Sequence, residues 1–118
     1  MVRHMGNYST TLDKAFHALS DPTRRAVLSR LIDGPASVKA LAEPFAMGLP
    51  SFMKHIKMLE DSRLIASEKQ GRIRTCHLNA EQLAAAEGWL GQQRALWEAR
   101  TDRLAQYAQS LASKERDK

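Results

Sequence analysis

Residues 49–61 constrain the fold of this chain more than any other stretch, because their apolar positions repeat with the period of a helix. At 100° per residue, Phe52, Ile56 and Leu59 fall within one sector of roughly 60°. The opposite face is polar and carries Lys54 and Lys57. The stretch therefore predicts a short helix with an apolar back that is buried and a basic front that suits a ligand surface.

Length and composition set the bounds for the rest. A chain of 118 residues fits one domain, and it has no run of 18 apolar residues that would predict a transmembrane helix. No signal-peptide pattern is seen either. The one cysteine, Cys76, cannot form an internal disulfide, which fits the reducing cytosol and predicts a cytoplasmic protein.

The net charge of +5 is unevenly distributed along the chain. Residues 1–78 hold 12 Lys and Arg against 7 Asp and Glu, whereas residues 79–118 hold 6 of each kind. A basic excess confined to the part that contains the 49–61 helix favours an anionic partner, either nucleic acid or a membrane surface. A soluble basic domain without such a partner remains the alternative.

Two helices are predicted near the start of the chain. The first, over 11–19, follows from the spacing of Leu12, Ala15, Phe16 and Leu19. Asp21 is placed to cap the second, which begins at Pro22 and runs to about Ile32. Its predicted inward residues are Val27, Leu28, Leu31 and Ile32, and its predicted outward residues are Arg24, Arg25 and Arg30.

A third, short helix leads into the 49–61 helix. Ser37 is its predicted cap, and its inward residues are Val38, Leu41, Ala42 and Phe45. A tight turn over 46–48 follows, with Gly48 as the cap of the next helix. Two short helices joined by such a turn form a helix-turn-helix, whose second helix can enter a DNA major groove.

The residue pattern changes from helical to β-prone after Arg63. The segments 64–69 and 73–78 predict two strands, and Gly71 between them can adopt a positive φ. A hairpin placed directly after a helix-turn-helix is a wing. Arg72 and Arg74 would then lie near a phosphate or a minor groove.

The last predicted helix runs over about 80–111, with Asn79 as its cap. Large apolar residues recur there every seven positions: Leu83, Leu90, Trp97, Leu104 and Leu111. Gln93 and Arg100 interrupt the second seam position, so a full coiled coil is not predicted. A seam of this length exceeds what a domain of about 70 residues can cover, which favours a second chain. A helix that folds back on its own core is the alternative.

These elements predict a mainly α fold with a small β-hairpin, namely a winged helix-turn-helix with a long C-terminal dimerisation helix. The expected organisation is a flexible N-terminus over 1–10, a DNA-binding domain over 11–79, a dimerisation helix over 80–112 and a polar tail over 113–118. Within the N-terminus, residues 1–5 are interpreted as partly a remnant of expression.

Several motifs resemble those of the ArsR-type (ArsR/SmtB) winged-helix transcriptional repressors. The similarity covers about residues 12–80 and lies in Leu-Ser-Asp-Pro-Thr-Arg at 19–24, Lys-His-Ile-x-x-Leu-Glu at 54–60, Leu-Ile at 64–65 and Gly-Arg at 71–72. The resemblance implies a homodimer joined through its first and last helices, a recognition helix in the major groove, and repression relieved by a signal.

The chain is similar to the branch of that family that lacks the metal-binding cysteines. Ser37, Val38 and Lys39 stand where metal-sensing members have Cys-Val-Cys, and no histidine follows His77. His4, His17 and His77 have no ligand spacing. We therefore expect no metal and no cofactor. Zinc or arsenite should not release the protein from DNA.

The sequence thus predicts a homodimeric, sequence-specific regulator of transcription that acts as a repressor on an imperfectly palindromic DNA operator. The recognition helix is about 49–61, and the wing spans 69–74. The candidate DNA contacts are Pro50, Ser51, Met53, Lys54, His55, Lys57, Arg72 and Arg74. The candidate dimer contacts are Leu12, Phe16, Leu83, Leu90, Trp97 and Leu104. An inducer, either a small molecule or a protein, stays unidentified.

Alternatives remain open at several of these positions. The lysines could be a solvated face, His55 a partly buried structural histidine, and Cys76 an inert strand thiol rather than a redox sensor. A winged-helix module that binds protein or RNA without reading an operator is the second hypothesis. The basic front of the helix and Arg72 favour DNA, but an exposed Met53 and Met58 keep the alternative open. An enzyme is not expected, because no nucleophile set, glycine-rich phosphate loop or metal-spaced carboxylate pair occurs.

Overall fold

The computed structural model describes residues 2–116, and the side chains of residues 10–116. The chain divides into two compact units, Met1–Ala86 and Glu87–Lys118. The elements in order are α1 (Val2–Leu19), α2 (Pro22–Ile32), β1 (Ala36–Ser37), α3 (Val38–Ala42), α4 (Leu49–Asp61), β2 (Ile65–Gln70), β3 (Ile73–Leu78) and α5 (Ala80–Arg116). The mainly helical fold class with a small β-hairpin is confirmed.

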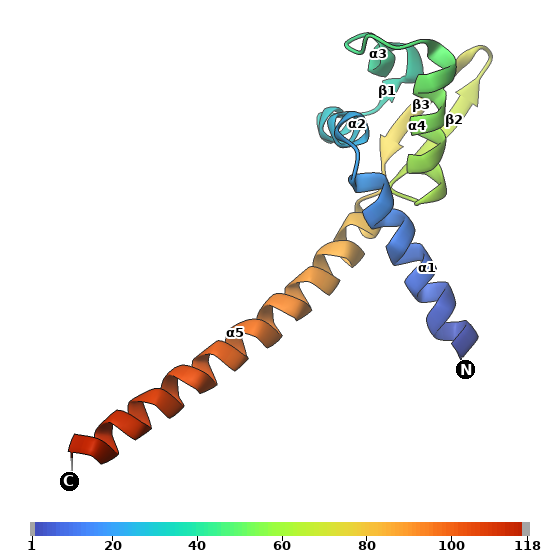
Figure 1. The fold of residues 1–118 in the computed structure, drawn as a ribbon. Coiled ribbons are helices and arrows are strands. Elements are labelled where there is room, and N and C mark those ends of the chain that lie inside the picture. Colours follow the sequence, from blue (N-terminus) through green and yellow to red (C-terminus); the bar gives the residue numbers. More distant parts are fainter. Residues whose placement is uncertain (1, 117–118) are drawn as a thin grey trace. The chain divides into compact units, whose positions relative to one another are not determined.

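The first unit combines short helices with a three-stranded antiparallel sheet in the order β1-β3-β2 (Figure 1). β2 and β3 form the predicted hairpin, with Gln70 paired to Ile73 across the turn. Gly71 has a φ of 63° in that turn, as its freedom from a Cβ allows. The two-residue strand β1, which pairs Ala36 with Cys76, was not predicted.

The core of the first unit is built on the apolar back of α4. Phe52, Ile56 and Leu59 are completely buried, as predicted. Burying each such side chain stabilises the fold by roughly 1.5–3 kcal/mol. They pack in one cluster with residues of α1, α2, α3, the sheet and the segment just before β2: Ala15, Ala18, Val27, Leu28, Leu31, Ala36, Val38, Leu41, Leu64, Ile65 and Cys76. The candidate recognition helix α4 is therefore held in place by packing within a single chain.

Two predictions for α2 are wrong. Ile32, predicted inward, is 70% exposed at the end of the helix. Arg24, predicted outward, is only 6% exposed. The apolar period of α2 places Val27, Leu28 and Leu31 correctly, but it takes no account of polar partners that other segments supply to an arginine.

The first and last helices are longer than predicted, toward the N-terminus and the C-terminus respectively. α1 begins at Val2 rather than near residue 11, and α5 continues to Arg116. The predicted flexible N-terminus (1–10) and polar tail (113–118) lie partly outside the described residues.

In the second unit, the described residues 87–116 are all helical and belong to α5. Within this segment the large apolar side chains are exposed: Trp89, Leu90, Leu96, Trp97, Leu104, Tyr107 and Leu111. Across the described part of the chain, no helix has the length and apolar character needed to cross a membrane.

Candidate nucleic-acid interface

The helix α4 presents its polar face to solvent from a rigid support. Gly48 is its N-cap, with no capping bond from a side chain, and Pro50 lies in the first turn. Behind the helix, the ring of Phe52 stacks on that of Phe45 with centroids 5.6 Å apart. Figure 1 shows α4 beside the hairpin of β2 and β3, so helix and wing are neighbours.

The predicted contact residues of α4 fall into two groups. Pro50, Ser51, Lys54 and Lys57 are exposed on the front of the helix. Met53, His55 and Met58 are half-buried, and Met53 packs against the core. The expectation that Met53 and Met58 are freely exposed is therefore wrong, because both lie at the edge of the buried face.

Leu49 is a surface residue of α4 that the sequence reasoning missed. It is 57% exposed at the first position of the helix, one turn before Met53. Its place next to the Gly48 cap was the available signal, since a residue in the first turn faces whatever the helix N-terminus approaches. It extends the candidate surface toward the end of the helix that enters a groove first.

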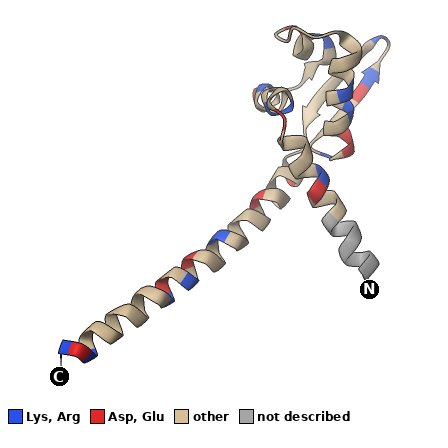
Figure 2. Ribbon diagram, viewed as in Figure 1, with Lys and Arg blue, Asp and Glu red and all other residues tan. Residues whose placement is uncertain are grey.

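The wing carries one exposed and one engaged arginine. Arg72 is exposed in the hairpin turn. Arg74 is half-buried, and its Nη1 donates to Ser67 Oγ over 3.0 Å, while Ser67 Oγ donates to Glu60 Oε2 over 3.2 Å. This chain of bonds ties the wing to the C-terminal part of α4. The ribbon coloured by charge shows Lys and Arg on α4 and near the end of the hairpin (Figure 2).

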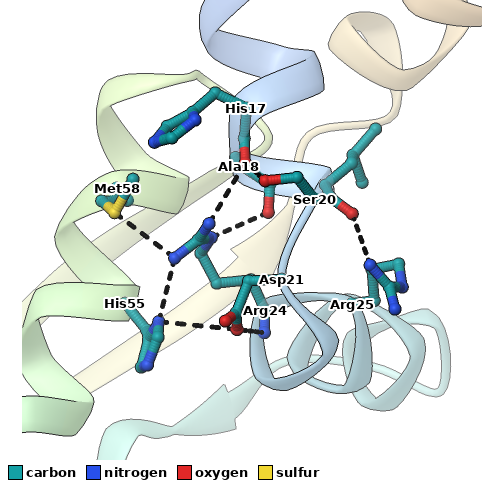
Figure 3. A network of polar contacts seen from close by, with 9 residues as sticks. His17, Ala18, Ser20, Asp21, Arg24, Arg25, His55 and Met58 are labelled. Atoms are coloured by element: carbon teal, nitrogen blue, oxygen red, sulfur yellow. Dashed lines mark hydrogen bonds and ion pairs between the residues drawn. The ribbon is translucent and has the colours of Figure 1, made fainter.

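A buried guanidinium joins α1, α2 and α4 (Figure 3). Arg24 Nε donates to the carbonyl of Ala18 over 2.8 Å, and Nη2 donates to the carbonyl of His17 over 3.1 Å. Its Nη1 lies 3.1 Å from His55 Nδ1 and 3.4 Å from the sulfur of Met58. Arg24 thus satisfies two carbonyls at the end of α1 while holding two side chains of α4.

Asp21 completes this corner of the molecule. Its Oδ2 accepts the backbone N–H of Arg24 over 3.0 Å, which caps α2 as predicted, and lies 3.7 Å from His55 Nδ1. The hydrogen bond from the Arg24 backbone, helped by the nearby charge of Arg24, holds the pKa of the Asp21 carboxyl below its usual value. The Asp21 carboxyl is therefore ionised in the folded protein at neutral pH.

The one cysteine is buried in the sheet. Burial, together with the carboxylate of Glu60, raises the pKa of the Cys76 thiol to about 11. The thiol is accordingly protonated and weakly nucleophilic at neutral pH, as an inert strand cysteine would be. Among the described residues, no group of three or more His, Cys, Asp or Glu side chains is arranged to hold a metal ion.

The candidate dimer residues occupy both units. On α1, Leu12 and Phe16 are half-buried, and Leu83 in the first turns of α5 is half-buried against the core. In the second unit Leu90, Trp97 and Leu104 are each more than half exposed. The two groups therefore differ in how much apolar surface each has left to bury.

A short helix, a turn, a second helix backed on the core and a β-hairpin beside it define a winged helix-turn-helix protein. Comparison with known proteins agrees: a family profile described as a helix-turn-helix domain matches residues 19–68. An HTH-type transcriptional regulator of Mycobacterium tuberculosis is 38% identical over 73 residues, covering 62% of this chain and 68% of the relative. The transcriptional repressor SdpR of Bacillus subtilis is 30% identical over 79 residues, covering 67% and 88%.

A solved structure gives the same answer at higher identity. The crystal structure of an ArsR family transcriptional regulator is 58% identical, with a TM-score of 0.75, and the match covers 77% of this chain and 94% of that one. The chain belongs to the ArsR family of winged-helix transcriptional regulators. The resemblance seen in the 19–24 and 54–60 motifs is thereby confirmed.

Proposed function

We propose that the protein is a homodimeric, sequence-specific DNA-binding repressor of transcription that works in the cytoplasm. The observation that carries this proposal is the asymmetry of α4. Its back, Phe52, Ile56 and Leu59, is completely buried, while Lys54 and Lys57 are exposed on its front. A helix held this firmly can enter a major groove without losing its own order.

The front of α4 divides by chemistry into positioning and reading residues. Lys54 and Lys57 supply the charge that attracts phosphates, and Arg72 on the wing extends that contact along the backbone or into the minor groove. Ser51, and Met53 at the edge of the core, face base edges, where a thioether contacts a thymine methyl but donates no hydrogen bond. Pro50 lies in the first turn of α4, at the end of the helix that enters the groove. Arg74 acts mainly by holding the wing against α4 through Ser67.

The second unit supports the dimer part of the proposal. Its described residues expose a series of large apolar side chains at helical spacing, and Trp97 is 67% exposed. Soluble proteins rarely leave such a contiguous apolar surface uncovered. A second copy of the chain would cover Leu90, Trp97 and Leu104. In the first unit, Leu12 and Phe16 of α1 are the proposed dimer contacts.

A dimer fixes the form of the operator. Two copies of α4 would enter successive major grooves about 34 Å apart, on one side of the duplex. The operator is then an imperfect palindrome with half-sites about 10 base pairs apart, centre to centre. The inducer is an unidentified small molecule or protein. Zinc and arsenite are poor candidates, because Ser37, Val38 and Lys39 provide no thiolate.

The test is a footprint of the full chain on DNA upstream of its own coding region, combined with selection of bound duplexes from a random pool. The proposal expects two protected half-sites with that spacing, and a selected consensus with dyad symmetry. A protein that selects no consensus, or protects no DNA, would not be an operator-binding repressor. Such a result would favour the second hypothesis, a winged-helix module that binds protein or RNA.

A further inference from the structure

The contacts of Arg24 lead to a conclusion about the neighbouring histidine on the recognition helix. We infer that Arg24 is a positioning residue for DNA binding: its guanidinium fixes His55 in the tautomer that carries the proton on Nε2, and this outward N–H donates to a DNA phosphate. The inference rests on the proposed function. It adds a buried residue from α2 and names the atom of His55 that makes the contact.

The direction of the hydrogen bond between Arg24 and His55 follows from which of the two side chains can donate. A guanidinium has five N–H donors, no acceptor, and keeps its charge in proteins. Arg24 Nη1 lies 3.1 Å from His55 Nδ1, so Nδ1 must be the acceptor. A neutral imidazole whose Nδ1 accepts carries its proton on Nε2.

Arg24 is held in place by its other contacts. The side chain is nearly buried, and its Nε and Nη2 are held by the carbonyls of Ala18 and His17 at the end of α1. The remaining Nη1 donors point at His55 and at the sulfur of Met58, one turn further along α4. The guanidinium therefore has little freedom to turn away, and the ring of His55 is held in one orientation.

The other ring nitrogen of His55, Nε2, points away from Arg24 (Figure 3). The side chain of His55 is 22% exposed, so part of the ring reaches the surface. Figure 3 shows Nδ1 directed at Arg24 and Asp21 and the second ring nitrogen directed away from both. His55 follows Lys54, whose side chain is exposed on the same helix. An N–H donor on a helix that also exposes a lysine suits a phosphate oxygen.

Charge balance at this corner is compatible with an anion outside it. Asp21 lies 3.7 Å from Nδ1, on the inner side of the ring, and its carboxylate is engaged by the Arg24 backbone N–H. The buried charge of Arg24 offsets it. A phosphate that approaches Nε2 of His55 therefore meets a ring whose Nδ1 edge contacts the positive charge of Arg24.

Two substitutions at one position separate the roles of the two ring nitrogens. His55→Asn keeps an acceptor near Nδ1 for Arg24 but has no donor at the Nε2 position. His55→Gln keeps a donor near Nε2 but offers Arg24 nothing at Nδ1. We expect His55→Asn to keep its stability to urea and to bind a selected operator duplex about tenfold to a hundredfold more weakly. We expect His55→Gln to lose stability and to bind closer to wild type.

The link to Arg24 is tested by a double-mutant cycle. Arg24→Lys is made in the wild type and in His55→Asn, and DNA affinity is measured only for variants whose circular dichroism shows a folded chain. The cycle should be non-additive, because once the outward donor is gone Arg24 has nothing left to position. Additive effects would overturn the positioning role. Equal operator affinity for wild type and His55→Asn would overturn the donor role.

A measurement without DNA covers the case in which Arg24→Lys does not fold. A long-range proton–nitrogen correlation spectrum of the full chain, at about pH 8.5 where free imidazole is neutral, reports the tautomer of each ring. The signal missing from His55→Asn belongs to His55, and His77 is the internal reference. We expect one tautomer with an unprotonated Nδ1; a proton on Nδ1, or an average of both tautomers, would overturn the inference. Failure of the proposed function is recognised separately, since the wild type would then bind no DNA while the ring pattern persisted.

Discussion

The helices α4 and α5 both carry regularly spaced large apolar side chains, but these side chains are buried in α4 and mostly exposed in α5. The apolar face of α4 is buried by α1, α2, α3 and the sheet of the same unit. The apolar side chains of α5 between Trp89 and Leu111 remain exposed in the single chain. An apolar repeat alone therefore does not say which surface covers it.

This difference indicates which helix is stabilised within one chain and which helix we expect to be stabilised by a partner. α4 is stabilised within the monomer, so its front is free to contact a ligand. We expect α5 to gain stability from association, because a long helix with little packing of its own is marginal in water. We expect mutations in α4 and in α5 to respond differently to protein concentration.

A substitution on the buried back of α4 should have the strongest effect on stability. Phe52→Ala should lower the free energy of unfolding by about 3–5 kcal/mol, because the fully buried ring leaves a cavity and loses its stacking on Phe45. The loss should be seen by urea denaturation at every protein concentration. Leu49→Ala, at an exposed position of the same helix, is the matched control, with a change within about 0.5 kcal/mol. Equal effects would mean that α4 is not anchored as described.

The next effect is on the apolar side chains of α5. Trp97→Ala should weaken dimerisation by about 2–4 kcal/mol, or roughly thirtyfold to a thousandfold, if the indole is buried at the partner chain. Sedimentation equilibrium over a range of concentrations measures this. Arg94→Ala is the control, because its contact with Glu98 at 3.8 Å is an exposed pair worth little. A wild-type protein that is monomeric at micromolar concentration would remove the contrast between the two helices.

A smaller effect is expected on the front of α4 and on the wing. Lys57→Ala and Arg72→Ala should each weaken binding to all DNA sequences by about 1 kcal/mol per phosphate contact, and each substitution acts once in every protomer of the dimer. Fluorescence anisotropy with operator and scrambled duplexes measures both. Ser51→Ala should instead change the preferred sequence. A lysine or arginine variant that loses only operator binding would contradict the assignment to phosphates.

The smallest effect concerns the corner that braces α4 through α2. Asp21→Ala should cost about 1 kcal/mol by removing the N-cap of α2. Because the folded-state pKa of Asp21 is lowered, its ionised form adds stability above the ordinary carboxyl pKa of about 3.9, and this is lost as the pH falls through the folded value. Asp21→Asn should make unfolding less sensitive to pH below about 4. Identical acid profiles for wild type and Asp21→Asn would show that this carboxylate is not linked to folding.

Much of this architecture could be predicted from the sequence. The helical period identified the back of α4, and the residue types at Asp21, Ser37 and Gly48 located three helix starts that the structure confirms. Gly71 located the turn of the wing. These features depend on neighbours along the chain, which is why a local pattern revealed them.

What escaped prediction depends on segments that are far apart. Arg24 is buried because two carbonyls from α1 and a ring from α4 meet it, and no period within α2 records that. The strand β1 is too short to carry an alternation and exists through its pairing with β3. Ile32 fits the inward period but lies at the exposed end of its helix. The roles assigned to DNA and dimer contacts stay predictions until they are measured.

A salt titration of operator and scrambled DNA with the wild-type chain measures both the charge contacts and the sequence preference proposed for α4. If each protomer neutralises three phosphates, the slope of log affinity against log salt should be about −5, and the operator should bind more tightly than the scrambled duplex at every salt concentration. An affinity that does not depend on salt, or that is equal for both duplexes, would contradict the account of α4 as the recognition helix of a sequence-specific repressor.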